Sequence, residues 1–454
     1  MGGSVAVIGA GAAGLVTAQS LRAQGLDVKV FEASDRVGGL WNYGLGNGIY
    51  RSLVTNLPKE IMQYDPRWPF PAECSSFLQH QEVLRYLEVF VQDNGLADVI
   101  ALSSPVRSVR LRDNDCWEVQ VGPESSTPQL FAAVVVCNGH FNEPFSPAMP
   151  GLHEFPGQVV HSAAYDSPEA YTAKTVLVVG AKSSGTDLAR ELSSVASRVI
   201  VSDKSCQQPA EVARISHRGV IERMEGSTAV FSDGWRETGV EVVIFCTGYR
   251  YRFPFLAPGL VDVPDGRCVL PLFEHMFHAR HPTLAFVGIP SSVVPFPLFA
   301  AQARWLASVF SGSSELPSTS EMQAWVERKL ATVQDPKQLH LMSGAQWEYL
   351  RGIAAYTSEE LRVPETFLRV SEAIYDDVGA ARPRFPGAAD DYRRREYSVD
   401  WDTGVWSVAE VEDMADIELG LVDCQPPYPV QTLSNLIQFR PVPPGRANAH
   451  MHMF

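Results

Sequence analysis

The sequence has no pair of cysteines at CxxC spacing and no long apolar run. Its seven cysteines are an odd number, and no group of His, Cys or carboxylate residues has the spacing of metal ligands. These absences argue against a dithiol redox centre and a metal site, and they are typical of a reducing compartment. No window approaches ~18 uncharged apolar residues, so the sequence predicts no membrane span.

Basic residues are also scarce. Lys and Arg total 37 against 52 Asp and Glu, which gives a net charge of −15. This balance disfavours nucleic acid or an anionic membrane as a partner. A strand is predicted almost at Met1 with no signal peptide before it, so we expect a soluble cytoplasmic protein. The 454 residues are enough for two or three globular domains.

The N-terminal stretch carries the strongest signal. The apolar run 4–8 leads directly into Gly9-Ala10-Gly11-Ala12-Ala13-Gly14, a helical pattern follows to Gly25, and a second apolar run ends at Glu32. The three glycines allow a tight turn, a close approach of a pyrophosphate and close helix–strand packing. Glu32 stands where a carboxylate can accept hydrogen bonds from a ribose. This order predicts a dinucleotide site, and the alternative is a chance glycine turn.

A second unit of the same kind begins about 170 residues later. Strand 175–179 precedes Gly180-Ala181-Lys182-Ser183-Ser184-Gly185, and a helix over 186–195 and a strand over 198–201 follow. Lys182 replaces the middle glycine, which lowers the specificity of this motif. The alternative is a βαβ crossover without a ligand.

The rest of the chain alternates between helical patterns and apolar strands. We predict buried parallel strands over 132–137, 240–245 and 284–287, and an antiparallel insertion over 106–112 and 117–121. Helices are predicted over 81–93, 300–310, 321–332 and 347–356. Past about Phe385 no core pattern is visible, and we expect a loosely packed extension.

Several motifs together resemble one family. In order, the chain shows GAGAAG, Glu32, GGLW, TNLPKE, CNGH, GAKSSG and FCTGY, and residues 155–165 fit FxGxxxHxxxY. This set is similar to the flavin-containing monooxygenases, the class B flavoprotein monooxygenases, over about residues 4–350. CNGHFNEP and PFPLFAAQARWLASVFSG resemble the plant-type branch that oxygenates sulfur and nitrogen. Baeyer–Villiger relatives carry tryptophan where this chain has Tyr165.

The resemblance implies an α/β fold with two Rossmann-like dinucleotide-binding domains of the three-layer type, one inserted in the other. The FAD-binding domain would comprise residues 1–155 and 285–385. The NADPH-binding domain would comprise residues 165–284. Residues 386–454 would form a C-terminal extension of unknown role.

The resemblance also implies which residues bind the two cofactors. The residues expected to contact FAD or NADPH are Gly9, Ala10, Gly11, Ala12, Ala13, Gly14, Glu32, Arg36, Gly39, Leu40, Trp41, Thr55, Asn56, Val106, Gln302, Gly180, Ser183, Ser184, Gly185, Asp187, Ser202, Lys204 and Thr247. Asp203 opposes the binding of an NADPH 2′-phosphate, so Ser202 and Lys204 must outweigh it.

Asn56 is the candidate catalytic residue, since the resemblance places its amide beside flavin and nicotinamide. Without the resemblance, a turn asparagine before Leu-Pro would be the better interpretation. His161 and Tyr165 are expected to be structural, with a general base at His161 as the alternative. His140 is read as a satisfied surface histidine. Gln302 could be a cofactor contact or a helix-surface glutamine.

The implied activity is transfer of one oxygen atom from O2, through a C4a-hydroperoxyflavin, to a thioether sulfur or an amine nitrogen of a small molecule. The alternatives are an auxin-forming decarboxylating monooxygenase and a non-catalytic dinucleotide-binding protein. A disulfide reductase would need a redox cysteine pair, which the sequence lacks. A homodimer is also expected.

Overall fold

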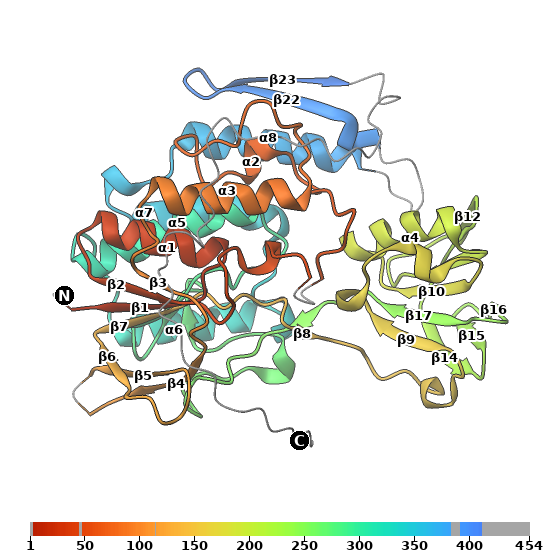
Figure 1. Cartoon of the computed structure of the whole chain (residues 1–454), viewed down its shortest axis with the longest axis horizontal. Helices are drawn as coiled ribbons and strands as arrows, with labels where there is room; N and C mark the ends of the chain where they lie inside the picture. The colour runs from red at the N-terminus through yellow and green to blue at the C-terminus, as the bar shows by residue number, and fades with distance from the viewer. Residues whose placement is uncertain (1–2, 45–47, 114, 383–390, 411–454) are drawn as a thin grey trace, which may run out of the picture. The chain divides into compact units, whose positions relative to one another are not determined.

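Two mainly parallel β-sheets, each with antiparallel pairs at one edge, organise the chain. The computed structural model describes residues 3–44, 48–113, 115–382 and 391–410. One sheet has seven strands in the order β19-β20-β21-β7-β1-β2-β3, and the other has six in the order β12-β13-β11-β10-β17-β9 (Figure 1). The strands β1 and β10, which lead into the two predicted glycine turns, both lie inside their sheets. The predicted fold class is confirmed.

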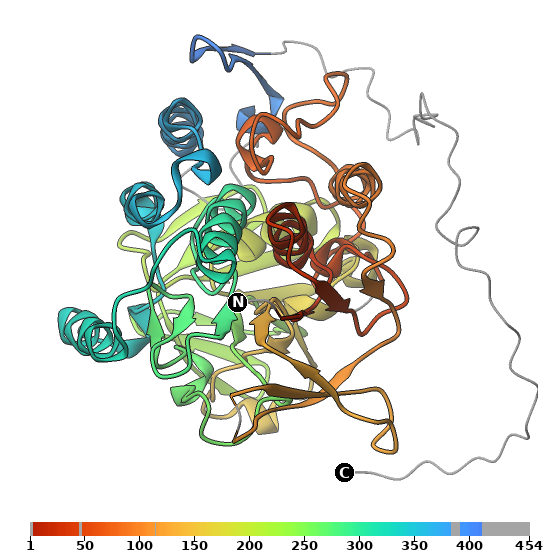
Figure 2. The same cartoon turned by 90° about the vertical axis from the view of Figure 1, so that its left-hand side faces the viewer.

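The first sheet is built around β1. Its strands are β1 (Val5–Ile8), β2 (Val28–Phe31), β3 (Ile100–Ala101), β7 (Ala133–Val136), β19 (Leu272–Phe273), β20 (Phe277–His278) and β21 (Leu284–Phe286). β1 pairs in parallel with β2 on one side and β7 on the other. Every residue of β1 and β7 is buried, as expected for apolar strands covered on both faces. Helices α1 (Ala12–Ala23) and α5 (Pro295–Ser311) lie side by side on this sheet (Figure 2).

The second sheet repeats this plan around β10. Its strands are β9 (Gln158–His161), β10 (Thr175–Val179), β11 (Arg198–Ser202), β12 (Ala210–Val212), β13 (Ile215–Arg218) and β17 (Val242–Phe245). β10 pairs in parallel with β11 and β17. Helix α4 (Ser183–Val195) connects β10 to β11 and packs with its apolar side on the sheet.

Smaller elements complete the described chain. The remaining α-helices are α2 (Lys59–Met62), α3 (His80–Asp93), α6 (Thr319–Thr332), α7 (Gln346–Tyr356) and α8 (Glu365–Ala381). The smaller sheets contain β4 (Val106–Leu111), β5 (Trp117–Val121), β6 (Gln129–Phe131), β8 (Glu143–Pro144), β14 (Ile221–Glu225), β15 (Thr228–Phe231), β16 (Arg236–Glu237), β18 (Tyr249–Arg250), β22 (Arg395–Asp400) and β23 (Val405–Glu410). The sequence did not predict α8, β13 to β16 or the β22–β23 hairpin.

Two expectations about the domains need correction. The chain returns to the first sheet at β19, so the predicted boundary near residue 285 is too late. Residues 391–410 are not loosely packed: Tyr392 and Tyr397 are buried, and both rings contact Phe77. The β22–β23 hairpin lies beside α2 and α8 (Figure 1). Residues 386–390 and 411–454 of the predicted extension lie outside the described residues.

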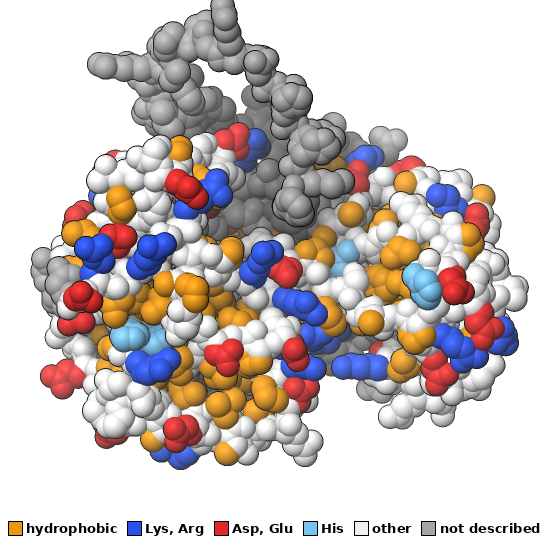
Figure 3. Space-filling view, turned by 90° about the horizontal axis from the view of Figure 1, so that it is seen from below, with side chains coloured by type: hydrophobic (Ala, Val, Ile, Leu, Met, Phe, Trp, Pro, Cys, Tyr) orange, Lys and Arg blue, Asp and Glu red, His pale blue; other side chains and the backbone are white. Residues whose placement is uncertain are grey.

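On the face drawn in Figure 3, several basic side chains lie close together near the middle, and acidic and basic side chains are interspersed over the rest. Among the helices that the structure describes, none is both long and apolar enough to cross a membrane.

Candidate active site

The first glycine turn needs glycine at its two ends. Gly9 follows β1 with a φ of 105°, and its N–H donates to the Phe31 carbonyl at 2.8 Å. A Cβ at Gly9 would lie 2.6 Å from the Cys137 carbonyl oxygen, and one at Gly14 would lie 1.9 Å from the Gly9 oxygen. A side chain at Gly9 would clash with the end of β7, and one at Gly14 would push helix α1 away from the turn.

The middle of this turn faces a second glycine loop. A Cβ at Gly39 would lie 2.9 Å from the Gly11 Cα, so the two backbones approach without side chains between them. No side chain caps helix α1 at Gly11, so the N–H groups of its first turn point out of the helix end. Glycine backbone at an uncapped helix N-terminus suits the pyrophosphate of a dinucleotide.

Glu32 lies at the carboxyl end of β2, beside the same turn. Its Oε2 accepts from the Ala10 N–H at 2.7 Å, and its Oε1 accepts from the N–H and hydroxyl of Ser34, both at 2.8 Å. The buried carboxylate is therefore fixed against the glycine turn, where the sequence predicts a ribose. A carboxylate has about four acceptor sites, so these bonds leave capacity for a ribose hydroxyl.

The other residues predicted to bind FAD have contacts outside the first glycine turn. Arg36 pairs with Asp35 at 2.9 Å and is more than half exposed. Trp41, next to Leu40, packs edge-on against Phe296 at the start of α5. Val106 opens β4 and pairs with Val121. Roles of these four residues toward FAD stay predictions.

The second turn reproduces the first. Gly180 has a φ of 102°, its N–H donates to the Ser202 carbonyl at 2.8 Å, and a Cβ there would lie 2.6 Å from the Cys246 oxygen. A Cβ at Gly185 would lie 1.8 Å from the Gly180 oxygen. Lys182 takes the middle position as the N-cap of α4 in an extended conformation, and no side chain caps the helix. This helix end suits a second pyrophosphate, and Ser183 and Ser184 lie in its first turn.

The predicted 2′-phosphate residues differ in exposure. Ser202 is buried; its hydroxyl donates to the Gly219 carbonyl at 3.1 Å and accepts from the Ile221 N–H at 2.9 Å. Ser202 therefore ties β11 to its neighbouring loop, and a role for Ser202 at the NADPH 2′-phosphate stays a prediction. Lys204 is exposed. The expectation for Lys204 stays a prediction.

Asp203 is engaged within its own loop. Its carboxylate accepts from the Ser205 N–H at 2.9 Å and the Ser205 hydroxyl at 2.7 Å, and it lies 3.2 Å from Nε2 of His217. Burial alone would raise the pKa of Asp203, but these hydrogen bonds outweigh burial and lower the pKa. The carboxylate is ionised at neutral pH, and its partners are already in place.

Asn56 lies where the two halves of the chain meet. Its Nδ2 donates to the Ser183 hydroxyl at 3.1 Å, although the residues are 127 positions apart. Thr55 is buried, and its hydroxyl donates to the Leu57 carbonyl and accepts from the Leu78 N–H, both at 2.9 Å. Thr55 thus fixes the loop, while the half-buried Asn56 amide reaches the start of α4.

Gln302 is not a surface residue. It is fully buried in α5, its Oε1 accepts from the Gly288 N–H and its Nε2 donates to the Tyr349 hydroxyl, both at 2.9 Å. Half-buried His140 lies 3.1 Å from the Gly288 carbonyl, and burial lowers the pKa of His140 to about 4. Gln302 and a neutral His140 therefore hold the same loop from two sides. A direct contact between Gln302 and a cofactor stays a prediction.

The fingerprint residues contact protein groups. Nδ1 of His161 accepts from the Ala163 N–H, so its Nε2 carries the proton of the neutral ring and donates to the Gly248 carbonyl at 3.1 Å. Partial burial lowers the pKa of His161. The buried Tyr165 hydroxyl donates to Glu191 at 2.8 Å. These bonds agree with the structural roles expected for both residues.

Two more predicted cofactor residues have protein partners. The Thr247 hydroxyl donates to the Phe145 carbonyl. Asp187 forms ion pairs with Arg190 and with Arg393 from the C-terminal segment. The sequence did not predict a role for Arg393 or for Arg382, which contacts the Asn56 carbonyl. The run Arg393-Arg394-Arg395 between aromatic residues was the signal that could have identified the segment.

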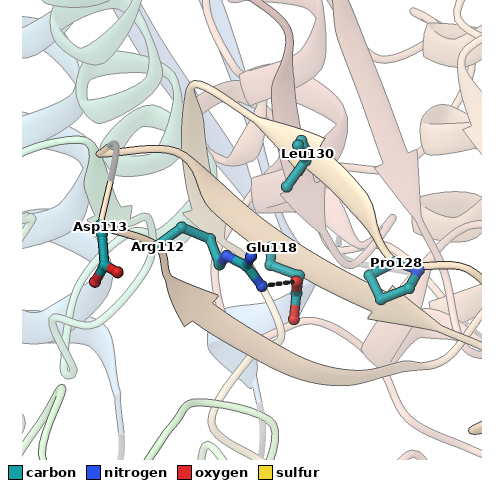
Figure 4. Close-up of a pocket in the computed structure, with 5 residues that line it drawn as sticks. All are labelled: Arg112, Asp113, Glu118, Pro128 and Leu130. Carbon is teal, nitrogen blue, oxygen red and sulfur yellow. Dashed lines mark hydrogen bonds and ion pairs between the residues drawn. The ribbon is translucent and has the colours of Figure 1, made fainter.

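A shallow hollow lies elsewhere, on the sheet of β4, β5 and β6. Arg112 and Glu118 form an ion pair at 2.7 Å within it, with Asp113, Pro128 and Leu130 around them (Figure 4). It contains none of the predicted site residues. Across the described ranges, no three His, Cys, Asp or Glu side chains are grouped to hold a metal.

Two mainly parallel sheets, in each of which a central strand leads into a glycine turn at an uncapped helix, define a protein that binds two dinucleotides. The chain belongs to the flavin-binding monooxygenase-like family, whose sequence pattern matches residues 2–224 and 209–369.

Curated relatives and solved structures refine this class. Flavin-containing monooxygenase FMO GS-OX5 of Arabidopsis thaliana is 33% identical over 447 residues, which cover 90% of this chain and 94% of that protein. FMO GS-OX-like 6 of the same plant is 37% identical over 380 residues. This match covers 76% of this chain and 80% of that protein. The structure of S-allyl-L-cysteine S-oxygenase from Allium sativum has a TM-score of 0.79 at 32% identity and covers 88% of this chain and 96% of that one. Tmm from Pelagibacter sp. strain HTCC7211 shares the fold, with a TM-score of 0.76 at 24% identity over 90% and 96% of the chains.

These similarities bear out the plant-type resemblance. The protein is a flavin monooxygenase, and its cofactors are FAD and NADPH. The two glycine turns and Glu32 fit these cofactors by their lack of side chains, their free helix ends and their acceptor groups.

Proposed function

We propose that the protein transfers one oxygen atom from O2 to the sulfur of a small thioether, by the C4a-hydroperoxyflavin route that the family resemblance implies. An amine nitrogen is the second candidate acceptor. The contact of Asn56 with Ser183 carries the proposal, because it joins the predicted catalytic amide to the start of the second dinucleotide helix. The similarity to an S-oxygenase at 32% identity favours sulfur.

The protein's own part is binding, orientation and exclusion of water. When bound, FAD supplies the activation of dioxygen and NADPH supplies the electrons. The turn 9–14 and Glu32 would hold the adenosine diphosphate part of FAD, and the turn 180–185 would hold the pyrophosphate of NADPH. The Asn56 amide would donate hydrogen bonds at the reacting end of the cofactors.

Buried residues of α5 keep that end poor in water. Gln302 is fully buried and bonded at both ends of its amide, and Phe296 packs against Trp41 and Tyr64. A rigid apolar wall strengthens the hydrogen bonds inside the site and slows hydrolytic loss of reactive oxygen. Few residues then need to touch the substrate.

The test is product analysis by mass spectrometry under 18O2 with a panel of thioethers, tertiary amines and 2-oxo acids. We expect a sulfoxide that carries one 18O for each NADPH oxidised. An N-oxide as main product would assign the amine, and loss of CO2 from a 2-oxo acid would assign the decarboxylating alternative. Purified protein that never consumes NADPH would support the non-catalytic alternative.

The proposal extends to the location and assembly of the protein. We propose a cytoplasmic enzyme that acts as a homodimer on a small molecule and O2. Size-exclusion chromatography with light scattering would test the dimer, and cell fractionation would test the location.

A further inference from the structure

We propose that Arg393 is a positioning residue for Asn56 and that it joins the Asn56 loop to helix α4. The inference rests on the proposed function for the catalytic role of Asn56, while the contacts themselves are independent of that role. It also assigns a role to the C-terminal segment 391–410, for which the sequence predicted none.

The carbonyls of the Asn56 loop depend on arginines from far along the chain. The loop runs between the bridge of Val54 with Gln79 and the start of α2, so no helix or sheet ladder pairs these groups. The Thr55 carbonyl accepts from Nε of Arg393 at 2.9 Å, 338 residues later. The Asn56 carbonyl accepts from Nη2 of Arg382. Because buried backbone groups are costly without partners, these side chains fix the peptide that carries the Asn56 amide.

The same guanidinium holds the second dinucleotide helix. Nη1 and Nη2 of Arg393 donate to Oδ1 and Oδ2 of Asp187 at 3.1 and 3.0 Å. The two side chains are only 9% and 14% exposed, so water screens this forked pair weakly. Asp187 lies one turn beyond Ser183, which accepts from the Asn56 amide. Arg393 and Asn56 thus attach the loop to α4 at two adjacent points.

Arg393 is itself held rigidly. Its guanidinium lies over the ring of buried Tyr392, 5.1 Å from the centroid, and Tyr392 packs edge-on against Phe77. The following hairpin is anchored where Arg395 pairs with Asp377 on α8 at 2.5 Å. A fork presented on a fixed backbone can define the place of the loop, whereas a flexible surface arginine could not.

The substitutions Arg393→Gln and Arg393→Lys separate the fork from its charge. Arg351→Gln is the control, because Arg351 also joins two partners through its guanidinium, the carboxylates of Glu365 and Glu372 on α8, but neither lies in the Asn56 loop or α4. Each purified holoenzyme is compared for FAD content, for hydrogen–deuterium exchange of peptides covering 53–58 and 183–190, and for hydrogen peroxide formed per NADPH.

For Arg393→Gln we expect bound FAD to remain, exchange of both peptides to rise at least tenfold, and the peroxide yield per NADPH to rise severalfold. Arg393→Lys should give an intermediate result, because a lysine cannot reach both partners with a fixed fork. The proposal would be overturned if exchange in Arg393→Gln equals that of the wild type. It would also be overturned if Arg351→Gln raises exchange of the two peptides as much as Arg393→Gln does. Wild-type exchange and peroxide yield in Arg393→Lys would also overturn it, since a positive charge alone would then be sufficient to hold the Asn56 loop.

A double-mutant cycle tests the partner. If the pair acts as one unit, Asp187→Asn combined with Arg393→Gln should raise exchange no further than the worse single substitution. Independent, multiplying effects would overturn the link to α4. If the wild type forms no oxygenated product, the proposed function fails, but the exchange measurements still decide whether Arg393 positions the loop.

Discussion

The two glycine turns of this protein share one geometry at their ends. Gly9 and Gly180 have φ values of 105° and 102°, and a Cβ at either would lie 2.6 Å from the carbonyl oxygen of a cysteine. Gly14 and Gly185 are equally crowded by the turns before them. The acids also correspond, since Glu32 binds the N–H and hydroxyl of Ser34 as Asp203 binds those of Ser205.

The turns differ where they would meet a ligand. The middle glycine, Gly11, is replaced by Lys182 in the second unit. The third partner of the acid differs too: Glu32 accepts from Ala10 in its own glycine turn, whereas Asp203 is held by His217 on β13. In the second sheet β13 lies on the side of β11 away from β10. The second acid is therefore held by a strand on the far side of β11 from its turn, and we expect a 2′-phosphate to bind beside that turn.

The largest effect is expected at Gly11. Gly11→Val should leave largely apo protein, because its side chain would fill the approach to the pyrophosphate. A Cβ at Gly11 meets only the Gly39 backbone, at 3.5 Å, so the turn itself should still form. The measurement is flavin absorbance per protein, with circular dichroism as the check on folding. Normal FAD occupancy would show that the first turn is misassigned.

Asn56, which links the two units, should give the next largest effect. Asn56→Ala should still bind FAD and oxidise NADPH, but it should lose one hydrogen bond, about 1–3 kcal/mol, or roughly one to two orders of magnitude in the lifetime of the oxygenating species. Asn56→Asp should be at least as damaging, since a carboxylate cannot donate the amide's N–H bonds. The readout is peroxide per NADPH and oxygenated product. Unchanged coupling in Asn56→Ala would return this residue to a turn role.

Acid should destabilise the region around β19 and β20 through buried neutral histidines. Nε2 of His340 accepts from the Val269 N–H at 3.0 Å, its Nδ1 lies 2.9 Å from Nδ1 of His275, and burial lowers the pKa of His340 to about 4. An unfolded histidine has a pKa of about 6.5, so the unfolded state binds more protons between these values. Stability from His340 is full above about pH 6.5 and is lost as pH falls toward 4.

His340→Gln measures this contribution. The variant should melt below the wild type at pH 7.5, and the difference in melting temperature should shrink as pH falls from about 6.5 to 4. A difference that is constant over this range would mean that His340 has the same pKa in the folded and unfolded states.

The sequence was sufficient for the parts that follow from local pattern. Apolar strands, glycine turns and the acids after β2 and β11 could be predicted, since each follows from backbone geometry over a few residues. The hydrogen-bond partners of Ser202 and Gln302 could not be predicted, because those partners lie in other elements. The arginine run 393–395 marks the segment, but the partners of Arg393 could not be predicted, because its contacts span 206 and 338 residues and no local period encodes them.

The smallest effect concerns the choice between NADPH and NADH, and it tests the difference between the acids most directly. Lys204 takes the place that Ala33 has in the first unit, and its exposed charge can pair with a 2′-phosphate. Lys204→Ala should raise the KM for NADPH and leave that for NADH nearly unchanged. Equal losses for both cofactors would mean that Lys204 does not read the phosphate, and a wild type that prefers NADH would mean that Asp203 decides.

His217→Phe should sharpen this result. Without His217, Asp203 keeps its bonds to Ser205 but is free to turn toward the glycine turn, as Glu32 does, where it would accept from a ribose hydroxyl and repel a phosphate. We expect a severalfold loss of affinity for 2′,5′-ADP with little loss for ADP, measured by calorimetry on the FAD-loaded enzyme. The double variant His217→Phe/Asp203→Ser is the control and should regain 2′,5′-ADP binding. If His217→Phe binds both nucleotides like the wild type, the orientation of Asp203 does not depend on His217.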